Sequence, residues 1–579
     1  MRLIAAVTCA VISLAGADLL TAEDIRADRL FPETTIGYVE IPSPPELINT
    51  ILDHPLSKWI QGLKEFSAAT KTEAYRSFLT GRKFFEVQIG AEYRPAIEGL
   101  TEHGIALGFD SRTRGAALLV RGRDAATMEN FRAKILELTR LNKNVKQPDP
   151  YREIPIYKLQ DGGGAVVNDW FVVTNNGDLG KLLIDRILDG QTPTGAALAD
   201  SQTYQRYQSD HSAAVGQFRA FADLQAIRDA GRNDRIFTGK TDNPIAELLL
   251  GGLQSVIRKA DYLAASLQIE PTSAELRLNA PFQADWIPEE RSWFFGDSAT
   301  GRAPALPAVP ETLLTFATYR NLSQMWLRAG DLFDERMNDQ LAEADSNLST
   351  IFAGRDFGED ILGSLRPEFG VVVTRQSFDE NAPVPTIKLP AFAFVGRLRD
   401  PEIMKPELRR TFQSAIGFFN IVGAQNGQPQ LEMDMRKSET LDLVTSRYVP
   451  DKSQAGSSAA PLIFNFSPSV AFAGDRFVLA STAQLAEKLA TAPNADDLTN
   501  VNTQMSLDAD VAGAVLNDNR DQLVSQNMLE DGKSREEAEA AIDLLIQTVQ
   551  RFTRANVMLE NPEGSIGVRF LLRADETVP

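Results

Sequence analysis

The segment AVVNDWFVVTNNGDLGKLL (165–183) aligns without a gap on AFAGDRFVLASTAQLAEKL (471–489). Each copy has two short apolar runs that flank a turn at an aspartate, and then a helix-forming stretch with leucines on one face. The pattern predicts a β-hairpin that leads into an amphipathic helix, and the chain contains it twice.

Two further pairs of segments recur in the same order along the chain. PETTIGYVEI (32–41) pairs with PETLLTFATY (310–319), and VRGRDAATM (120–128) pairs with GRLRDPEIM (396–404). Self-similarity that keeps its order over so long a distance indicates two copies of one module of roughly 250 residues.

Within each copy the hydrophobic patterns predict an α+β module, with an antiparallel or mixed sheet and helices packed on it. Apolar runs bounded by Gly, Pro or Asp predict the strands, at 104–110, 115–122, 263–280, 370–376, 391–398 and 555–572. Residues suited to N-caps and capping boxes mark the helix starts, namely Asp124, Asp400, Ser481 with Gln484, and Ser534 with Glu537. Strict β-α-β alternation is absent, which disfavours a doubly wound parallel sheet.

The N-terminus resembles an export signal. Arg2 precedes an apolar stretch over 3–15, and the small residues Ala15, Gly16 and Ala17 suit a cleavage site. We therefore expect a mature chain that begins near Asp18 and is secreted, periplasmic or associated with the cell envelope. We expect no transmembrane segment in it.

The expected organisation is a signal peptide over 1–17, a first module over 32–282, a linker over 283–309 and a second module over 310–573. The linker contains Pro and Gly but also four large aromatic residues, Trp286, Trp293, Phe294 and Phe295. Leaving such side chains in water forgoes roughly 1.5–3 kcal/mol each. We expect them to be buried against one or both modules.

The chain is acidic, with a formal net charge of −19 and a sequence pI near 4.8. This balance argues against nucleic acid and anionic membranes as partners, because both select a basic face. The only cysteine, Cys9, lies in the expected signal peptide, so a mature chain would hold neither disulfides nor cysteine metal sites.

Residues that could support chemistry are few and scattered. His54, His103 and His211 lack the spacing of a metal site, so we expect no metal and no cofactor. Gly239-Lys240-Thr241 has Asp234 where a phosphate-binding loop requires glycine, and the DGGG run (161–164) suits a flexible turn.

Acidic pairs such as Glu289-Glu290 suit a solvated surface, and no pair stands out as a glycosidase pair. No G-x-S-x-G elbow is present. Catalytic residues are therefore unknown, and no repeated polar cluster suggests them.

The segments PETTIGYVEIP (32–42), NDWFVVTNNGDLGKLL (168–183), LADSQTYQRYQ (198–208) and FADLQAIR (221–228) resemble a family of exported bacterial proteins. The family is known only as a domain of unknown function and is found in planctomycete-type bacteria. The second copy departs from the pattern at VNTQMSLDADV (501–511). The resemblance implies export and a modular architecture, and it supplies no reaction, cofactor or catalytic residue.

The leading hypothesis is a non-enzymatic exported binding or envelope-associated protein whose partner is an unknown protein or envelope ligand. The alternative is an exported hydrolase that acts on polysaccharide or peptide through carboxylates of one module. A cleft holding two carboxylates with raised pKa values would favour the enzyme. A third possibility, an assembly or chaperone-like role, would require an apolar cavity between sheet and helices.

Overall fold

The computed structural model describes residues 25–141, 149–159, 162–190, 195–211, 216–230, 240–352, 354–378, 383–449 and 460–575. The chain divides into two compact units. Unit 1 holds the described residues up to position 230 together with Ala260–Pro281, and unit 2 holds 240–259 together with Phe282–Asp575. The expected signal peptide lies outside the described residues. No helix of the described ranges is long and apolar enough to cross a membrane.

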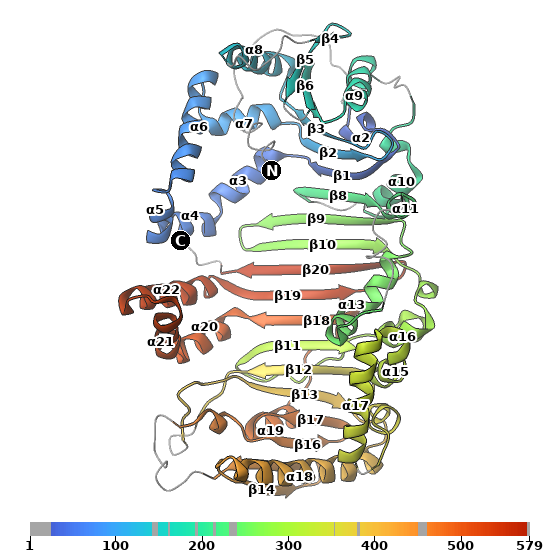
Figure 1. Cartoon of the computed structure of the whole chain (residues 1–579), viewed down its shortest axis with the longest axis vertical. Helices are drawn as coiled ribbons and strands as arrows, with labels where there is room; N and C mark the ends of the chain where they lie inside the picture. Colours follow the sequence, from blue (N-terminus) through green and yellow to red (C-terminus); the bar gives the residue numbers. More distant parts are fainter. Residues whose placement is uncertain are drawn as a thin grey trace. The chain divides into compact units, whose positions relative to one another are not determined.

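Unit 1 contains a sheet in which every strand runs antiparallel to its neighbours (Figure 1). The spatial order is β5-β6-β7-β3-β2-β1-β8-β9-β10, and β4 pairs with the outer side of β5. The strands are β1 (Thr35–Ile41), β2 (Ile105–Asp110), β3 (Gly115–Arg121), β4 (Asp149–Tyr151), β5 (Ile154–Leu159), β6 (Gly162–Val167), β7 (Trp170–Thr174), β8 (Phe218–Asp223), β9 (Tyr262–Glu270) and β10 (Ser273–Pro281).

The helices of unit 1 connect these strands. They are α2 (Ala27–Leu30), α3 (Pro44–Asp53), α4 (Pro55–Gly62), α5 (Lys64–Ala69), α6 (Glu73–Ile89), α7 (Tyr93–Thr101), α8 (Ala125–Leu141), α9 (Gly177–Asp189), η1 (Leu198–Asp200), α10 (Gln202–Asp210) and α11 (Leu224–Asp229). Asp124 caps α8 through the Thr127 amide, at 2.7 Å from Oδ1, as its sequence position predicts.

Unit 2 has a sheet of the same kind, with the order β14-β15-β16-β17-β13-β12-β11-β18-β19-β20. The strands are β11 (Thr312–Tyr319), β12 (Glu368–Thr374), β13 (Ala391–Arg397), β14 (Leu431–Lys437), β15 (Asp442–Tyr448), β16 (Ser469–Ala473), β17 (Arg476–Ala480), β18 (Val501–Asp508), β19 (Phe552–Glu560) and β20 (Ser565–Ala574).

The main helices of unit 2 are α13 (Pro244–Ile257), α14 (Ser292–Phe295), α15 (Leu322–Leu327), α16 (Ala329–Leu332), α17 (Glu335–Ile351), α18 (Pro401–Gln425), α19 (Ala483–Thr491), α20 (Ala509–Asp518), α21 (Arg520–Asp531) and α22 (Arg535–Val549). Shorter turns are η2 (Ala284–Trp286), η3 (Glu289–Arg291), η4 (Asp297–Ala299), η5 (Phe357–Ile361), η6 (Leu362–Ser364) and η7 (Leu462–Asn465). The predicted capping box of Ser534 and Glu537 opens α22 and is confirmed.

These elements confirm the predicted α+β class. The strand pairings of the two units also correspond one for one, from β1 with β11 to β10 with β20. Phe171 lies in β7, opposite Val120 and Val166, and Phe477 lies in β17, opposite Gly396 and Phe472. A duplication would produce this correspondence, and a common origin of the two units stays a hypothesis.

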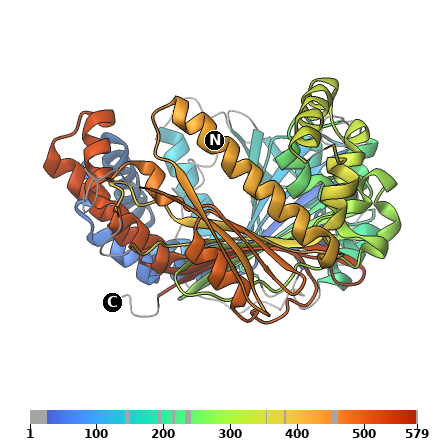
Figure 2. The same cartoon turned by 90° about the horizontal axis from the view of Figure 1, so that it is seen from below.

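Each sheet buries both of its faces where helices cover it. In unit 1 the Phe171 face packs against α7 and α8, whereas the opposite face packs against Leu179 and Leu183 of α9. In unit 2 the Phe477 face packs against Met404 of α18, which crosses the sheet in Figure 2. The opposite face of that sheet packs against α19. Successive side chains of a strand point to opposite faces of the sheet, so each strand contributes side chains to the core on both faces.

The expected linker (283–309) is part of unit 2 and forms short helical turns there. Trp293, Phe294 and Phe295 are fully buried. The Arg320 guanidinium lies 3.4 Å from the centre of the Phe294 ring and donates to the carbonyl of Leu248 in α13, at 2.7 Å. The unit boundaries therefore differ from the expected ones, because α13, within the expected first module, lies in unit 2.

Two local predictions were wrong, one by a single residue and one in the type of element. The N-cap of α19 is Thr482, whose Oγ1 accepts the Leu485 amide, instead of Ser481. The glycine run 162–164 forms the start of β6 instead of a turn before it. A Cβ on Gly162 would lie 2.2 Å from the carbonyl oxygen of Thr174, so the close approach of β7 requires glycine there.

Candidate functional site

An apolar cavity of about 550 Å³ lies in unit 1 between the Phe171 face of the sheet and the helices above it. This volume is in the range of small-molecule sites. None of its lining residues is charged. They are Ile48 from α3; Tyr93, Ile97, Leu100 and Thr101 from α7; Ile105, Leu107, Ala116, Leu118 and Val120 from β2 and β3; Met128 and Phe131 from α8; and Phe171, Val173, Thr174 and Asn175.

The floor of the cavity belongs to rows of apolar side chains that cross the sheet from strand to strand. One row follows the strand register through seven strands, as Val173, Leu118, Leu107, Val39, Ala220, Ala265 and Leu278. Beside it, Phe171, Val120, Ile105 and Ile41 form a row over β7, β3, β2 and β1, and Phe218, Leu267 and Leu276 form a row over β8, β9 and β10. Seven strands span roughly 29 Å across the sheet at about 4.8 Å per gap.

The opposite face of β9 and β10 is apolar at one end, where Tyr262 and Ala264 join the core, and polar at the other. There, Ser266 lies opposite Arg277, and Gln268 lies opposite Glu275. Antiparallel sheets usually turn the apolar face toward a core and the polar face toward water. On the cavity's side of the sheet, the apolar side chains of these strands are nevertheless only partly buried, namely Leu263, Ala265, Leu267, Leu276 and Leu278. An apolar surface that the protein itself leaves partly open suits an apolar ligand.

Unit 2 carries the same kind of row on its Phe477 face. Its members are Leu479, Phe394, Val371, Phe316, Met505, Val557 and Phe570. The side chains at the two ends of this row are exposed, Leu479 to 44% and Phe570 to 39%. Helices α20, α21 and α22 lie beside one end of β18 and β19 (Figure 1).

Larger side chains stand at two unit 2 positions that correspond to the floor of the unit 1 cavity, and one of them, Phe392, is 51% exposed. The registers match Ala116 with Phe392 and Leu118 with Phe394. The Phe394 ring stacks on Phe369, with centroids 5.4 Å apart. Two phenylalanines thus stand where unit 1 has an alanine and a leucine.

The histidines are not brought together. His54 caps α4 by accepting the Leu56 amide at Nδ1, at 3.2 Å. His103 is exposed in a turn. His211 follows α10, and its Nδ1 lies 3.0 Å from the Tyr207 carbonyl oxygen. Within the described ranges, no group of three or more His, Cys, Asp or Glu residues could hold a metal ion.

The other candidate residues lie at the surface or outside the described ranges. Glu289 is exposed and pairs with Arg328. Lys240 donates to the Gly330 carbonyl, while Asp234 and Gly239 lie outside the described residues.

Among the described residues, two carboxylates have raised pKa values, in both cases mainly through burial. They are Glu40 in β1 and Asp223, which caps α11 through the Ala226 amide. Neither lines the cavity. Since Glu40 pairs with Arg219 in the β1–β8 register, the Glu40 and Asp223 backbones lie about 13 Å apart along the strands.

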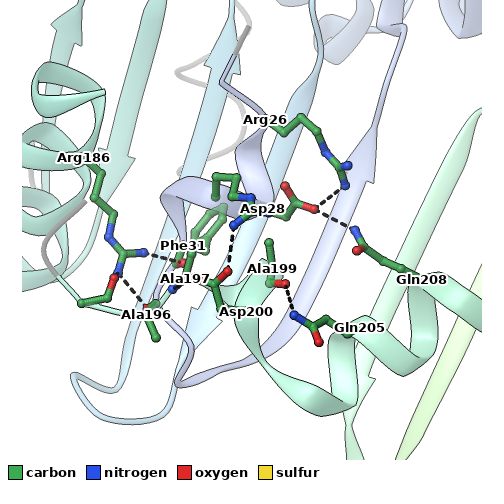
Figure 3. Close-up of polar contacts among 12 residues, drawn as sticks. Arg26, Asp28, Phe31, Arg186, Ala196, Ala197, Ala199, Asp200, Gln205 and Gln208 are labelled. Atoms are coloured by element: carbon green, nitrogen blue, oxygen red, sulfur yellow. Dashed lines mark hydrogen bonds and ion pairs between the residues drawn. The ribbon is translucent and has the colours of Figure 1, made fainter. Parts of the chain in front are cut away.

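A buried polar network near the N-terminus was not predictable from motifs (Figure 3). Arg186 of α9 is buried and donates to the carbonyls of Phe31 and Ala196, at 2.7 and 2.8 Å. Asp28 of α2 is also buried and accepts from Arg26 and from Gln208, the latter at 2.9 Å. These contacts tie α2 to α9 and α10, so we assign the network a structural role.

Comparisons with known proteins assign no family. No protein-family model matches the chain, and no curated protein matches it. Solved structures with some similarity include TP0453 in crystal forms IV, III and I, each with 9% sequence identity. The alignments cover 45% of this chain and 81%, 80% and 80% of those chains, with TM-scores of 0.25, 0.24 and 0.24. Scores this low carry no argument about function, and the resemblance to an exported bacterial family stays a hypothesis.

Proposed function

We propose that the protein is an exported, non-enzymatic binding protein that takes up the acyl chain of an amphiphile in the cavity of unit 1. The observation that carries the proposal is the uncharged cavity of about 550 Å³. Burial of an acyl chain there would remove apolar surface from water on both partners, which is favourable by about 25 cal/mol per Å².

An elongated ligand fits better than a compact one. Beyond the cavity, the seven-strand apolar row continues over β1, β8, β9 and β10 without a charged member. A chain of methylene groups can follow such a row without leaving a hydrogen-bonding group unsatisfied. Of the polar lining residues, Asn175 is exposed and can meet a headgroup, whereas Thr101 and Thr174 are buried and donate to the carbonyls of Ile97 and Ala116.

The absence of charge in the cavity also supports binding over hydrolysis. A hydrolase of the kind considered above needs two carboxylates at the substrate. The two carboxylates with raised pKa values lie on other parts of unit 1.

The test is a titration of the purified chain with a fluorescent long-chain fatty acid. Replacing Ala116 and Leu118 together by Phe copies the unit 2 pair and should fill the cavity. We expect saturable binding by the wild type and at least about tenfold weaker binding by the A116F/L118F variant, a loss of ~1.4 kcal/mol or more. Circular dichroism and thermal unfolding check that the variant is folded.

The matched control is Phe392→Leu, at the unit 2 position that corresponds to Ala116. It should bind the fatty acid like the wild type. Wild-type protein that shows no saturable binding, or a folded A116F/L118F variant with unchanged affinity, contradicts the proposal.

A further inference from the structure

The segment from Pro55 to Ile89, which we call the α4–α6 arm, exposes large apolar side chains on unit 1. Phe84 is 51% exposed and Val87 is 78% exposed, and Ile60 and Phe78 are similarly open. The neighbouring Phe85 is 1% exposed and packs on Tyr93 of α7, with ring centroids 5.7 Å apart. Phe85 thus holds α6 on unit 1, while Phe84 and Val87 remain accessible.

The same arm inverts the charge balance of the chain. Between positions 55 and 89 there are six Lys or Arg residues and three Glu residues, whereas the whole chain has 59 basic and 78 acidic residues. All six basic residues are exposed: Lys58, Lys64, Lys71, Arg76, Arg82 and Lys83. One of the three acids, Glu86, pairs with Arg82 at 3.1 Å.

Aromatic rings link the helices of the arm. Phe66 of α5 contacts Tyr75 of α6, with ring centroids 6.3 Å apart, and Tyr75 contacts Phe78 at 6.1 Å. Phe78 is 52% exposed, so the aromatic series reaches the surface. Aromatic and basic side chains together are typical of segments that lie at a membrane–water interface.

We propose that the α4–α6 arm docks unit 1 on the surface of an anionic phospholipid bilayer. Phe84, Val87 and Ile60 would enter the boundary between headgroups and acyl chains, and the Lys and Arg side chains would meet the lipid phosphates. The overall acidity of the chain predicts the opposite, but attraction is local because charges beyond about 8–10 Å are screened at physiological salt.

This proposal goes beyond ligand binding and does not depend on it. The two ideas are nevertheless compatible, since the residues before and after the arm, Ile48 in α3 and Tyr93 in α7, line the cavity.

The test is co-sedimentation of the full chain with vesicles of phosphatidylglycerol and phosphatidylcholine, and with vesicles of phosphatidylcholine alone. We expect binding to the anionic vesicles that weakens as salt is added. The F84D/V87D variant should lose at least about tenfold in vesicle affinity, and the K71E/K83E variant should lose the preference for anionic lipid.

Leu529→Asp is the matched control, because Leu529 is 86% exposed on α21 of unit 2. It should bind vesicles like the wild type. Fatty-acid titration of F84D/V87D without vesicles should give wild-type affinity, which separates failure of docking from failure of ligand binding.

Three results would overturn the docking proposal. The first is a wild type that does not bind anionic vesicles, and the second is an F84D/V87D variant that binds them like the wild type. The third is an L529D control that loses as much vesicle affinity as F84D/V87D. Light scattering that shows a wild-type dimer and a monomeric F84D/V87D variant would instead assign the patch to self-association.

Discussion

Leu118 and Phe394 hold the same position in the sheets of their units. Leu118 lies between Leu107 and Val173 on the neighbouring strands, and Phe394 lies between Val371 and Leu479. The residue with the smaller side chain lines a cavity, whereas the larger one stacks on another ring. Together with Ala116 and Phe392, this pair distinguishes the floor of the unit 1 cavity from the matching part of the unit 2 sheet.

The first prediction concerns this pair. Phe394→Leu should lower the free energy of unfolding of unit 2 by about 1–2 kcal/mol, because it removes the ring stacking on Phe369. Urea denaturation followed by intrinsic fluorescence measures the loss. Fatty-acid affinity in unit 1 should stay at the wild-type value, and a loss of affinity would show that the site is not confined to that unit.

Phe171 and Phe477 provide a second prediction. They are 9% and 8% exposed, and each anchors the packing of its sheet face. Replacing either residue by Ala should cost roughly 3–5 kcal/mol of stability. If thermal unfolding shows that either variant is as stable as the wild type, that ring does not contribute to a core.

The buried ion pair between Glu247 and Arg291 gives a third prediction. The Arg291 Nε and Nη2 atoms lie 2.6 and 3.0 Å from the two Glu247 carboxylate oxygens, and both side chains are almost fully buried. Arg291→Met should destabilise unit 2 by roughly 3–5 kcal/mol, because it leaves a buried carboxylate without its partner. Adding Glu247→Gln should recover part of the loss, and strict additivity in this double-mutant cycle would refute the coupling.

The fourth prediction is a pH dependence of stability. Burial raises the pKa of Glu40, although Arg219, 3.2 Å away, opposes the shift. Because the pKa of Glu40 is higher in the folded than in the unfolded state, folding takes up protons. The contribution of Glu40 to stability therefore falls as pH rises through the interval between these two pKa values. Glu40→Gln should remove this decline from urea midpoints measured between about pH 4 and pH 7.

A control of opposite sign exists in unit 2. The backbone amide and hydroxyl of Ser534 lower the pKa of Glu537, so its contribution is present above the ordinary glutamate pKa and is lost as pH falls. Glu537→Gln should therefore change the slope in the other direction. Equal slopes for wild type and E40Q would show that Glu40 titrates normally in the folded chain.

A fifth prediction tests the open apolar row of unit 2. Met505 and Phe570 are 40% and 39% exposed, so replacing both by Lys should leave folding nearly intact. Binding of a hydrophobic fluorescent dye should fall. Gln504→Lys, next to Met505 but on the opposite face, should leave dye binding unchanged, and an equal fall there would mean that added charge alone explains the effect.

Much of the fold could be predicted from the sequence because local patterns determine it. The alternation of Leu263, Ala265 and Leu267 with Ser266 and Gln268 predicts a strand with one apolar face. The caps at Asp124 and Ser534 fix where two helices begin. Such signals depend only on neighbours in the chain.

The candidate site could not be predicted in the same way. Whether an apolar strand face is covered depends on where helices from distant parts of the sequence pack. The alternation of apolar and polar residues in β9 would be the same for a covered and for an open face. The cavity itself depends on Ala116 and Leu118 meeting α7 and α8 across a register that only the folded sheet defines. The excess of basic residues in the α4–α6 arm can be read from the sequence, but it is not apparent from the net charge of −19 of the whole chain.

The assignment of α13 to unit 2 has a consequence for synthesis and folding. The ribosome completes α13 before it makes β9 and β10. Glu247 and Leu248 of α13 bind Arg291 and Arg320, respectively, and these two arginines are made later still. A nascent chain that ends near Pro281 therefore holds the described residues of unit 1 together with α13, whose partners in unit 2 have not yet been made. A gene divided at that point would encode α13 in the fragment that carries unit 1, although the helix belongs to unit 2. Producing the units separately therefore requires a permuted chain in which α13 is joined to unit 2.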